Sequence, residues 1–165
     1  MTRNYLESFL KSEPDTFWGL PNGDMLTLGY ELMARRSELI TFRSDDITER
    51  EDGTMRVPIR RCKSDSYGQR RSTLTLQRTA DLLREWLTYR GPTINWLFCP
   101  VCQGKVIDHC LEPMTIHRVI KEAAQRRGLR ADQVASFSGH SMRVGAAQDL
   151  LKREFDTAAV MRAGG

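Results

Sequence analysis

The sequence predicts a mainly α-helical domain with one small antiparallel β-sheet, the α+β class. The chain has 165 residues, of which 40% are hydrophobic, so one domain over residues 1–165 can bury a core. Apolar residues recur at helical spacing in several segments. One segment instead alternates with a period of two, placing Met55, Val57 and Ile59 on one face, as in a strand.

These patterns assign an element to each part of the chain. In the first half we expect a short helix over 4–11, a loop over 14–23 and a long helix over 23–42, kinked near its middle. The sheet is expected from a strand over 54–61, made an edge or irregular strand by Pro58, a turn over 64–71 and a return strand over 72–76. The remaining helices are expected over 79–90, 115–127, 140–153 and 156–163, the last capped by Asp156, with irregular chain over 91–113.

The composition narrows the class of protein. No apolar run approaches the roughly 20 residues of a membrane span, and the first 15 residues lack the apolar core of a signal peptide. The four cysteines are therefore expected as reduced thiols in a cytoplasmic protein with no membrane partner. The net charge of +4 favours a polyanionic partner.

The stretch SFSGHSMRVGAAQDLL, residues 136–151, predicts a phosphate site. His140 and Arg143 share one face of the first helical turn, where free backbone N–H groups and the positive end of the helix dipole also lie. A proton carrier, a fixed cation and a helix N-terminus together suit a phosphate group. The buried stripe of this helix is expected to consist of Val144, Ala147, Leu150 and Leu151.

Arg35 interrupts an otherwise apolar stripe in the long helix expected over 23–42. The other members of the stripe are Met25, Leu28, Leu32, Leu39 and Phe42. A guanidinium group on a core-facing stripe costs free energy unless it is paired or faces a polar cleft. Glu38, three residues on, is placed to hold it. The alternative is that Arg35 extends to solvent beside Arg36.

Lys63 lies where the first strand runs into its turn, in the stretch RRCKSDSYG. A lysine at such a position is usually solvated. A hairpin can also carry the ammonium group into a neighbouring cleft, where it acts as a proton donor. The sequence leaves both interpretations open.

Taken in this order, the three stretches resemble the catalytic domain of the tyrosine recombinases, the phage integrase family, and within it the Cre recombinase type. The first is Arg35-Arg36-Ser37-Glu38-Leu39, the second is Lys63 on a hairpin, and the third is the H-x-x-R element from His140 to Arg143. The flanking SGHSMRVGAAQDLL and the closing VMRAGG add to the likeness, which covers roughly residues 22–165.

The resemblance implies site-specific DNA recombination and integration of a mobile element, by strand breakage and rejoining through a 3′-phosphotyrosyl intermediate. One ester replaces another, so no metal or other cofactor is implied. Arg35 and Arg143 would stabilise the transition state, because guanidinium groups are planar, bidentate and always charged. His140 would assist at the phosphate, Lys63 would protonate the leaving oxygen, and Glu38 would orient Arg35. The implied partner is double-stranded DNA, in a nucleoid-associated protein.

The tyrosines depart from the family pattern. Tyr5, Tyr30, Tyr67 and Tyr89 all precede His140, whereas the family's nucleophile follows the H-x-x-R helix. We therefore expect a truncated catalytic domain, lacking the C-terminal nucleophile segment and the N-terminal DNA-clamp domain. This chain alone is expected to be inactive and mainly monomeric, while the full-length protein forms a tetramer on DNA. The alternative is a non-catalytic integrase remnant that binds DNA without cutting it.

Two further groups of residues allow other interpretations. Cys99-Pro-Val-Cys102, with His109 and Cys110 nearby, has the spacing of a zinc knuckle, which would make the chain a small interaction module. We favour ordinary thiols there, because His109 and Cys110 are adjacent. A second group, expected either to contact the DNA backbone or to form a solvated charged face, consists of Arg60, Arg61, Arg70, Arg71, Lys121, Arg126, Arg127 and Arg130.

Overall fold

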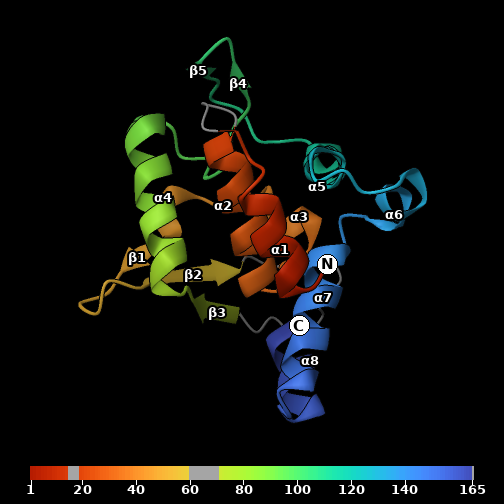
Figure 1. The fold of residues 1–165 in the computed structure, drawn as a ribbon. Helices are drawn as coiled ribbons and strands as arrows, with labels where there is room; N and C mark the ends of the chain where they lie inside the picture. The colour runs from red at the N-terminus through yellow and green to blue at the C-terminus, as the bar shows by residue number, and fades with distance from the viewer. Residues whose placement is uncertain (15–18, 60–70, 165) are drawn as a thin grey trace.

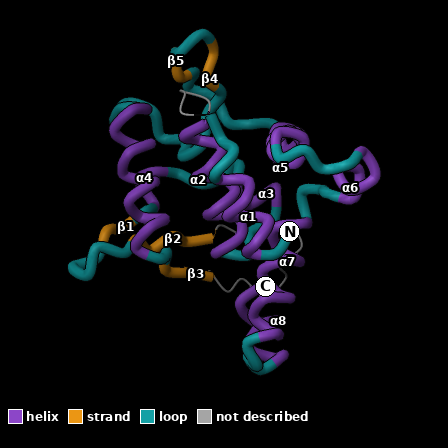
Figure 2. The backbone as a smooth tube through the Cα atoms, in the orientation of Figure 1, coloured by secondary structure: helices purple, strands orange, loops and turns teal. Residues whose placement is uncertain are grey.

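The computed structural model describes residues 1–14, 19–59 and 71–164, and its described part is mainly helical, as the sequence predicts (Figures 1 and 2). A short 3₁₀ turn, Ser44–Asp46, follows the third helix. The helices are α1 Arg3–Leu10, α2 Gly19–Glu31, α3 Arg36–Leu39, α4 Gln77–Arg90, α5 Pro113–Arg126, α6 Ala131–Ser136, α7 Ser141–Lys152 and α8 Thr157–Gly164.

The described strands form two small antiparallel sheets, one more than the sequence predicts. The first has the order β1-β2-β3, with β1 Thr48–Glu49, β2 Met55–Ile59 and β3 Arg71–Leu74. The second is a hairpin of β4 Val101–Cys102 and β5 Lys105–Val106. The strands β1, β4 and β5 are two residues long, too short to show a period of two, so sequence patterning misses them. Most of the turn expected over 64–71 lies outside the described residues.

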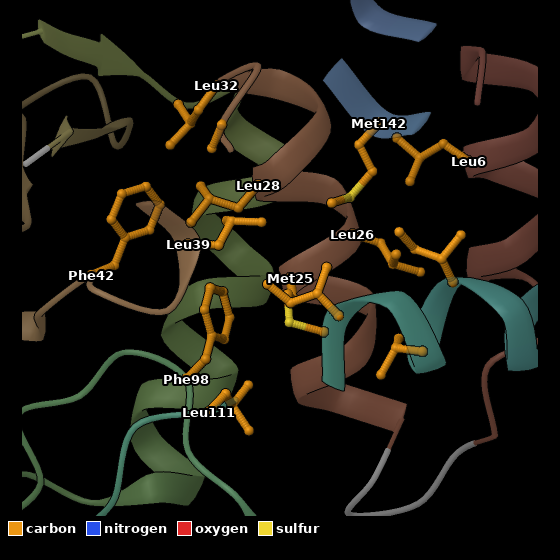
Figure 3. Close-up of a cluster of buried hydrophobic side chains, with 14 of the residues drawn as sticks. Leu6, Met25, Leu26, Leu28, Leu32, Leu39, Phe42, Phe98, Leu111 and Met142 are labelled. Carbon is orange, nitrogen blue, oxygen red and sulfur yellow. The ribbon is translucent and has the colours of Figure 1, made fainter. Parts of the chain in front are cut away.

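Helix α2 occupies the centre of the hydrophobic core (Figure 3). Its residues Met25, Leu26 and Leu28 are almost fully buried, because α4 and α7 pack against it and α1 covers another face. Leu6 from α1 and Met142 from α7 point into the same cluster in Figure 3. A helix this apolar on several faces must lie inside the domain, so α2 provides the fixed frame for the elements around it.

The long helix expected over 23–42 is instead two helices, α2 and α3, separated by a turn. Met33 adopts a left-handed conformation with φ of 50°. The Met33 N–H donates to Tyr30 O at 3.2 Å and the Ala34 N–H to Gly29 O at 3.1 Å, which is the Schellman pattern of a helix end. The break lies where the kink was expected. Glycine usually marks such a turn, and its absence left a complete break between two helices unpredicted. The apolar stripe is nevertheless buried as predicted, on both sides of the break.

The buried stripe expected for α7 is only partly correct, since Ala147 and Leu150 are half-buried against a small apolar cluster while Val144 and Leu151 are not. Val144 is 50% exposed and Leu151 is 45% exposed, and the buried residues are Met142, Gly145 and Ala146. The reason is close packing: a Cβ at position 145 would meet the Met1 carbonyl oxygen, so this face approaches the backbone of the first residues. The inner face of α7 therefore combines one large apolar side chain, Met142, with the small residues Gly145 and Ala146.

Other expectations were met to different degrees. Asp156 caps α8, its Oδ2 accepting the Ala159 N–H at 3.0 Å, as predicted. Helix α2 begins inside the loop expected over 14–23, and α6 was not predicted, since its six residues are too few to show a helical repeat. Within the described part of the chain, no helix has the length and apolar character needed to cross a membrane.

Candidate active site

The turn after α2 places Arg35 at the N-cap of α3, with extended backbone angles. Glu38, in the first turn of that helix, accepts two hydrogen bonds from it, one from the Arg35 backbone N–H at 2.7 Å and one from Nη1 at 2.8 Å. The Glu38 side chain is 5% exposed and that of Arg35 is 36% exposed. The carboxylate therefore fixes a half-exposed guanidinium group at a helix N-terminus, and the predicted Arg35–Glu38 pair is present.

Arg71, the first residue of β3, reaches the same carboxylate. Its Nη2 lies 3.7 Å from Glu38 Oε2, and its side chain is 17% exposed. Arg71 also donates hydrogen bonds to two backbone carbonyls, from Nη1 to Ala163 O at 2.5 Å and from Nη2 to Leu32 O at 3.4 Å. Arg71 therefore joins β3 to the end of α2, to α3 and to the end of α8.

Arg143 enters this group from α7. Its Nη1 donates to Met33 O at 3.4 Å. Burial lowers the pKa of the Arg143 guanidinium, and the positive charge of Arg35 lowers it further. The pKa of Arg71 is also lowered, chiefly by burial, with Glu38 opposing the shift and Arg143 and Arg35 adding to it. These four residues, Arg35, Arg71, Arg143 and Glu38, are here called the arginine cluster. Among the described residues, the cluster places three guanidinium groups near the Glu38 carboxylate.

Two glycines allow the chain to close around the arginine cluster. A Cβ at position 139 would lie 1.9 Å from Arg36 Cδ, so the start of α7 packs against the stem of Arg36 on α3. A Cβ at position 164 would lie 3.1 Å from Arg143 Nη2, so the end of α8 rests on the Arg143 guanidinium. Converging guanidinium groups in a half-buried position, near the N-termini of α3 and α7, suit an oxyanion such as a phosphate.

His140 is the N-cap residue of α7 and is exposed. It borders a hollow of about 450 Å³, whose wall also includes Tyr5, Phe137 and Ser141. Arg143, one turn later, makes its described hydrogen bond to Met33, on the side of the arginine cluster. The structure therefore brings Arg35 and Arg143 together, while a shared role for His140 stays a prediction.

The other predicted site residues either lie outside the described residues or are found away from the arginine cluster. Lys63, Arg60, Arg61 and Arg70 lie outside the described residues. Arg126 pairs with Glu13, Arg127 Nε donates to Ser8 Oγ at 2.5 Å, and Arg130 pairs with Asp132. Lys121 is half-buried on α5. These contacts within the molecule neither assign nor exclude a role on DNA.

The sequence did not place Arg71 in the arginine cluster, and grouped it with residues expected to contact the DNA backbone or solvent. The return strand was expected to start at residue 72, which left Arg71 in the turn. In the structure Arg71 pairs with Ile59 and shares a strand face with the half-buried Thr73. Alternate residues of a strand point to the same face, so Thr75, which is buried, shares its face with residue 73 and with Arg71. Because the expected strand began one residue too late, Arg71 was not recognised as facing inward.

The three described tyrosines are engaged elsewhere. Tyr30 donates its hydroxyl to Asp149 Oδ2 at 2.6 Å, and burial together with this carboxylate raises the pKa of Tyr30. Tyr89 donates to Gly104 O at 2.8 Å, and the ring of Tyr5 packs against Phe137. Tyr67 lies outside the described residues.

The zinc interpretation has no support in the structure. Among the described residues, no three histidine, cysteine or acidic side chains are grouped so that they can hold a metal ion. Cys99 is buried, where it donates to Trp96 O at 3.2 Å, and burial raises its pKa to about 11. Cys102 is exposed on the β4–β5 hairpin. Cys99, Cys102 and Cys110 are therefore free thiols.

Known protein sequences resemble this chain over nearly its whole length. The model of the phage integrase family matches residues 1–165 of the chain. Recombinase cre of Escherichia phage P1 is 29% identical over 171 residues, a match that covers 94% of this chain and 49% of that protein. The chain thus spans about half the length of this curated relative.

Solved structures share the fold. XerA recombinase has a TM-score of 0.77 at 16% identity, covering 100% of this chain and 55% of that one. XerH site-specific recombinase, bound to its difH substrate before cleavage, has a TM-score of 0.76 at 22% identity, covering 99% and 45%. The lambda integrase catalytic core has a TM-score of 0.68 at 15% identity, covering 100% and 90%. The fold predicted from the sequence is therefore confirmed.

Proposed function

The chain belongs to the phage integrase family, and from this premise we propose that it forms the phosphate-binding part of a site-specific recombinase active site. The substrate is double-stranded DNA. The reaction breaks a phosphodiester bond and rejoins the strand through a 3′-phosphotyrosyl intermediate. The observation that carries this proposal is the arginine cluster, in which three guanidinium groups from three parts of the chain converge near the half-exposed side chain of Arg35.

The proposed roles follow from where negative charge develops. Attack on the phosphorus produces a crowded phosphorane with extra charge on its non-bridging oxygens, and Arg35 and Arg143 stabilise it by charge-assisted hydrogen bonds. Glu38 keeps Arg35 in place. His140 assists at the phosphate as a proton carrier, and Lys63 protonates the leaving 5′-oxygen. An ester is exchanged for an ester, so the proposal requires no cofactor.

The proposal extends to partners. XerH is described as bound to a DNA substrate, and lambda integrase as bound to DNA and, at a core site, as a dimer. We infer that the whole protein containing this chain acts on DNA as a tetramer, associated with the nucleoid, and that the chain alone is mainly monomeric. Size-exclusion chromatography with light scattering, without DNA and then with a duplex, tests both statements. A stable tetramer in the absence of DNA would contradict the second.

Binding to a labelled duplex at several salt concentrations tests the phosphate site. We expect weak binding that falls steeply with salt, because each phosphate contact contributes about 0.9 to the logarithmic slope. Arg143→Met should weaken binding by about tenfold or more. Arg84→Met is the matched control, since it removes one guanidinium group that already pairs with Glu49 and Asp81. Absent or salt-independent binding, or equal losses in the two variants, would contradict the proposal.

A second assay asks whether the chain alone completes the covalent step. We expect no adduct with a nicked duplex on denaturing electrophoresis, because the described tyrosines hold other positions. An adduct would overturn this expectation, and mass spectrometry would then identify the tyrosine involved. Salt-dependent binding with no adduct is also what a non-catalytic DNA-binding remnant predicts. The same cleavage assay with a version of the chain extended by any native residues that follow Gly165 distinguishes the two.

A further inference from the structure

We propose that Arg71 is a positioning residue of the arginine cluster, which joins Glu38 to the C-terminal end of α8 and thereby sets the orientation in which Arg35 and Arg143 meet a phosphate. The phosphate part of this inference rests on the proposed function. The positioning part rests on contacts within the described chain.

The two terminal nitrogens of Arg71 both face protein acceptors. Its Nη1 donates to Ala163 O at 2.5 Å, and its Nη2 faces Leu32 O at 3.4 Å and the Glu38 carboxylate at 3.7 Å. Its Nε is buried without a hydrogen-bond partner, so it is not open to a ligand. Arg71 therefore lacks the free, exposed fork that bidentate binding of a phosphate needs. The Arg35 side chain is twice as exposed, at 36% against 17%.

The contact with Ala163 stabilises a short helix at its weak end. The last carbonyls of a helix have no partner within it and carry the negative end of the dipole, so a guanidinium group there is favourable. Helix α8 has eight residues, too few to be stable by itself. Its position therefore depends on contacts such as this one.

The end of α8 in turn rests on Arg143. Gly164 approaches the Arg143 guanidinium so closely that a Cβ there would lie 3.1 Å from Nη2. Arg71 holds the preceding residue and, through Glu38, the partner of Arg35. One side chain on β3 thus fixes the surroundings of both proposed phosphate-binding arginines.

This arrangement requires the shape of arginine as well as its charge. A lysine at position 71 would keep the positive charge, but its ammonium group is a point charge on a flexible stem and lacks the planar fork that reaches acceptors in three segments. A residue that bound phosphate directly would be largely replaced by lysine, because a point charge also binds phosphate. The lysine variant therefore separates the two roles.

The experiment compares Arg71→Lys and Arg71→Met with Arg84→Met, which also removes an arginine paired with a glutamate, at 2.6 Å from Glu49. Amide hydrogen exchange of residues 157–164 is measured without DNA, and affinity for a labelled duplex is measured across salt concentrations. We expect both Arg71 variants to raise exchange in α8 and to weaken DNA binding by about tenfold. Arg84→Met should change neither exchange in α8 nor, beyond two- to threefold, DNA affinity.

If both Arg71 variants show the same hydrogen exchange in α8 as the wild type, the positioning role is overturned. It is also overturned if Arg71→Lys binds DNA with the affinity of the wild type. If Arg71→Met does not unfold cooperatively, Arg71→Gln, which keeps an amide donor, takes its place. The exchange measurement needs no DNA. Raised exchange in α8 combined with DNA binding that Arg143→Met leaves unchanged would therefore support the positioning role while the proposed function fails.

Discussion

The end of α4 and the arginine cluster both bury arginine, but they use it differently. Arg90, the last residue of α4, is 6% exposed, and its Nη1 donates to the backbone carbonyls of Ile94 and Trp96, the latter at 3.0 Å. These neutral acceptors belong to the loop that follows, so Arg90 holds that loop in shape. In the arginine cluster, Arg35, Arg71 and Arg143 lie around the Glu38 carboxylate, within the described part of the chain.

Burial lowers the pKa of Arg90 and of Arg143 alike, so burial does not distinguish the two regions. The partners do. At Arg90, backbone carbonyls accept the hydrogen bonds of Nη1, and the charges of Asp45 and Asp108 favour the cation. In the arginine cluster, like charges oppose one another, and the Coulomb energy improves when an anion arrives. We therefore expect replacements at Arg90 to change stability and replacements at Arg143 to change binding.

Arg90→Met should have the largest effect on stability. The change leaves the buried Ile94 carbonyl without its Arg90 donor and removes one of the two donors to the Trp96 carbonyl. We expect the free energy of unfolding to fall by about 2–4 kcal/mol. Urea unfolding followed by circular dichroism measures this loss. Arg118→Met, at an exposed arginine of α5, is the control and should change the free energy by no more than about 0.5 kcal/mol. Equal losses of stability in the two variants would contradict a structural role for Arg90.

Asp24→Asn should have a smaller effect, because no hydrogen bond to the buried Oδ2 is lost. Burial, together with the charge of Glu85, raises the pKa of Asp24 well above its usual value of 3.8. The folded protein therefore holds this proton more tightly than the unfolded chain, and stability falls as the pH rises through the range between the two pKa values.

The asparagine variant lacks this titration. Its free energy of unfolding should match that of the wild type at acidic pH and exceed it increasingly toward neutral pH. Urea unfolding of both proteins across a pH series measures the difference. Taking the difference removes the parallel contributions of Glu13 and Glu31, whose pKa values are also raised by burial. A constant difference across the series would show that Asp24 does not titrate in this way.

Asp156→Ala should have a local effect of about 1 kcal/mol, because it removes the side-chain acceptor at the N-terminus of α8. Hydrogen exchange should rise in α8, the helix whose other end contacts Arg71 and Arg143, and stay unchanged in α4. Asp156→Asn keeps an acceptor and is the matched control. A loss spread evenly over the molecule would argue that α8 unfolds only with the rest of the domain.

Arg143→Met should have the smallest effect on stability, even though it strongly weakens the proposed DNA binding. The variant loses a long hydrogen bond to Met33 O but also removes repulsion from Arg35 and Arg71. We expect the free energy of unfolding to change by no more than about 0.5 kcal/mol. Thermal and urea unfolding measure it, with Arg90→Met as the contrasting variant. A loss as large as that of Arg90→Met would assign Arg143 to the fold rather than to a ligand.

Local patterns explain which parts of the fold were predictable. The helical repeats of α4 and α5, the alternation of β2 and the cap at Asp156 each depend on neighbours within one turn or one strand, so the sequence predicts them. Glu38 was identified for the same reason, since it lies three residues from Arg35. The inner face of α7 was not predictable in this way, because the need for Gly145 comes from its close contact with the backbone of Met1, at the other end of the chain.

The candidate site shows the same limit. Arg35 and Arg143 were singled out by a break in an apolar stripe and by a helix start. Arg71 enters through contacts with Glu38 and Ala163, which lie far from it in the sequence. Such contacts carry no local signal, and only the arrangement of β3 and α8 in space reveals them.

The turn at Met33 limits which residues this position can accept. Its left-handed backbone favours glycine and disfavours β-branched side chains. Its side chain, however, fills a small apolar cluster with Ala146 and Val160, where glycine would leave a cavity. These two demands oppose each other, and an unbranched, flexible apolar side chain meets both. In a library randomised at this position and selected for folding, we therefore expect methionine and leucine to be retained, while valine, isoleucine and glycine are lost.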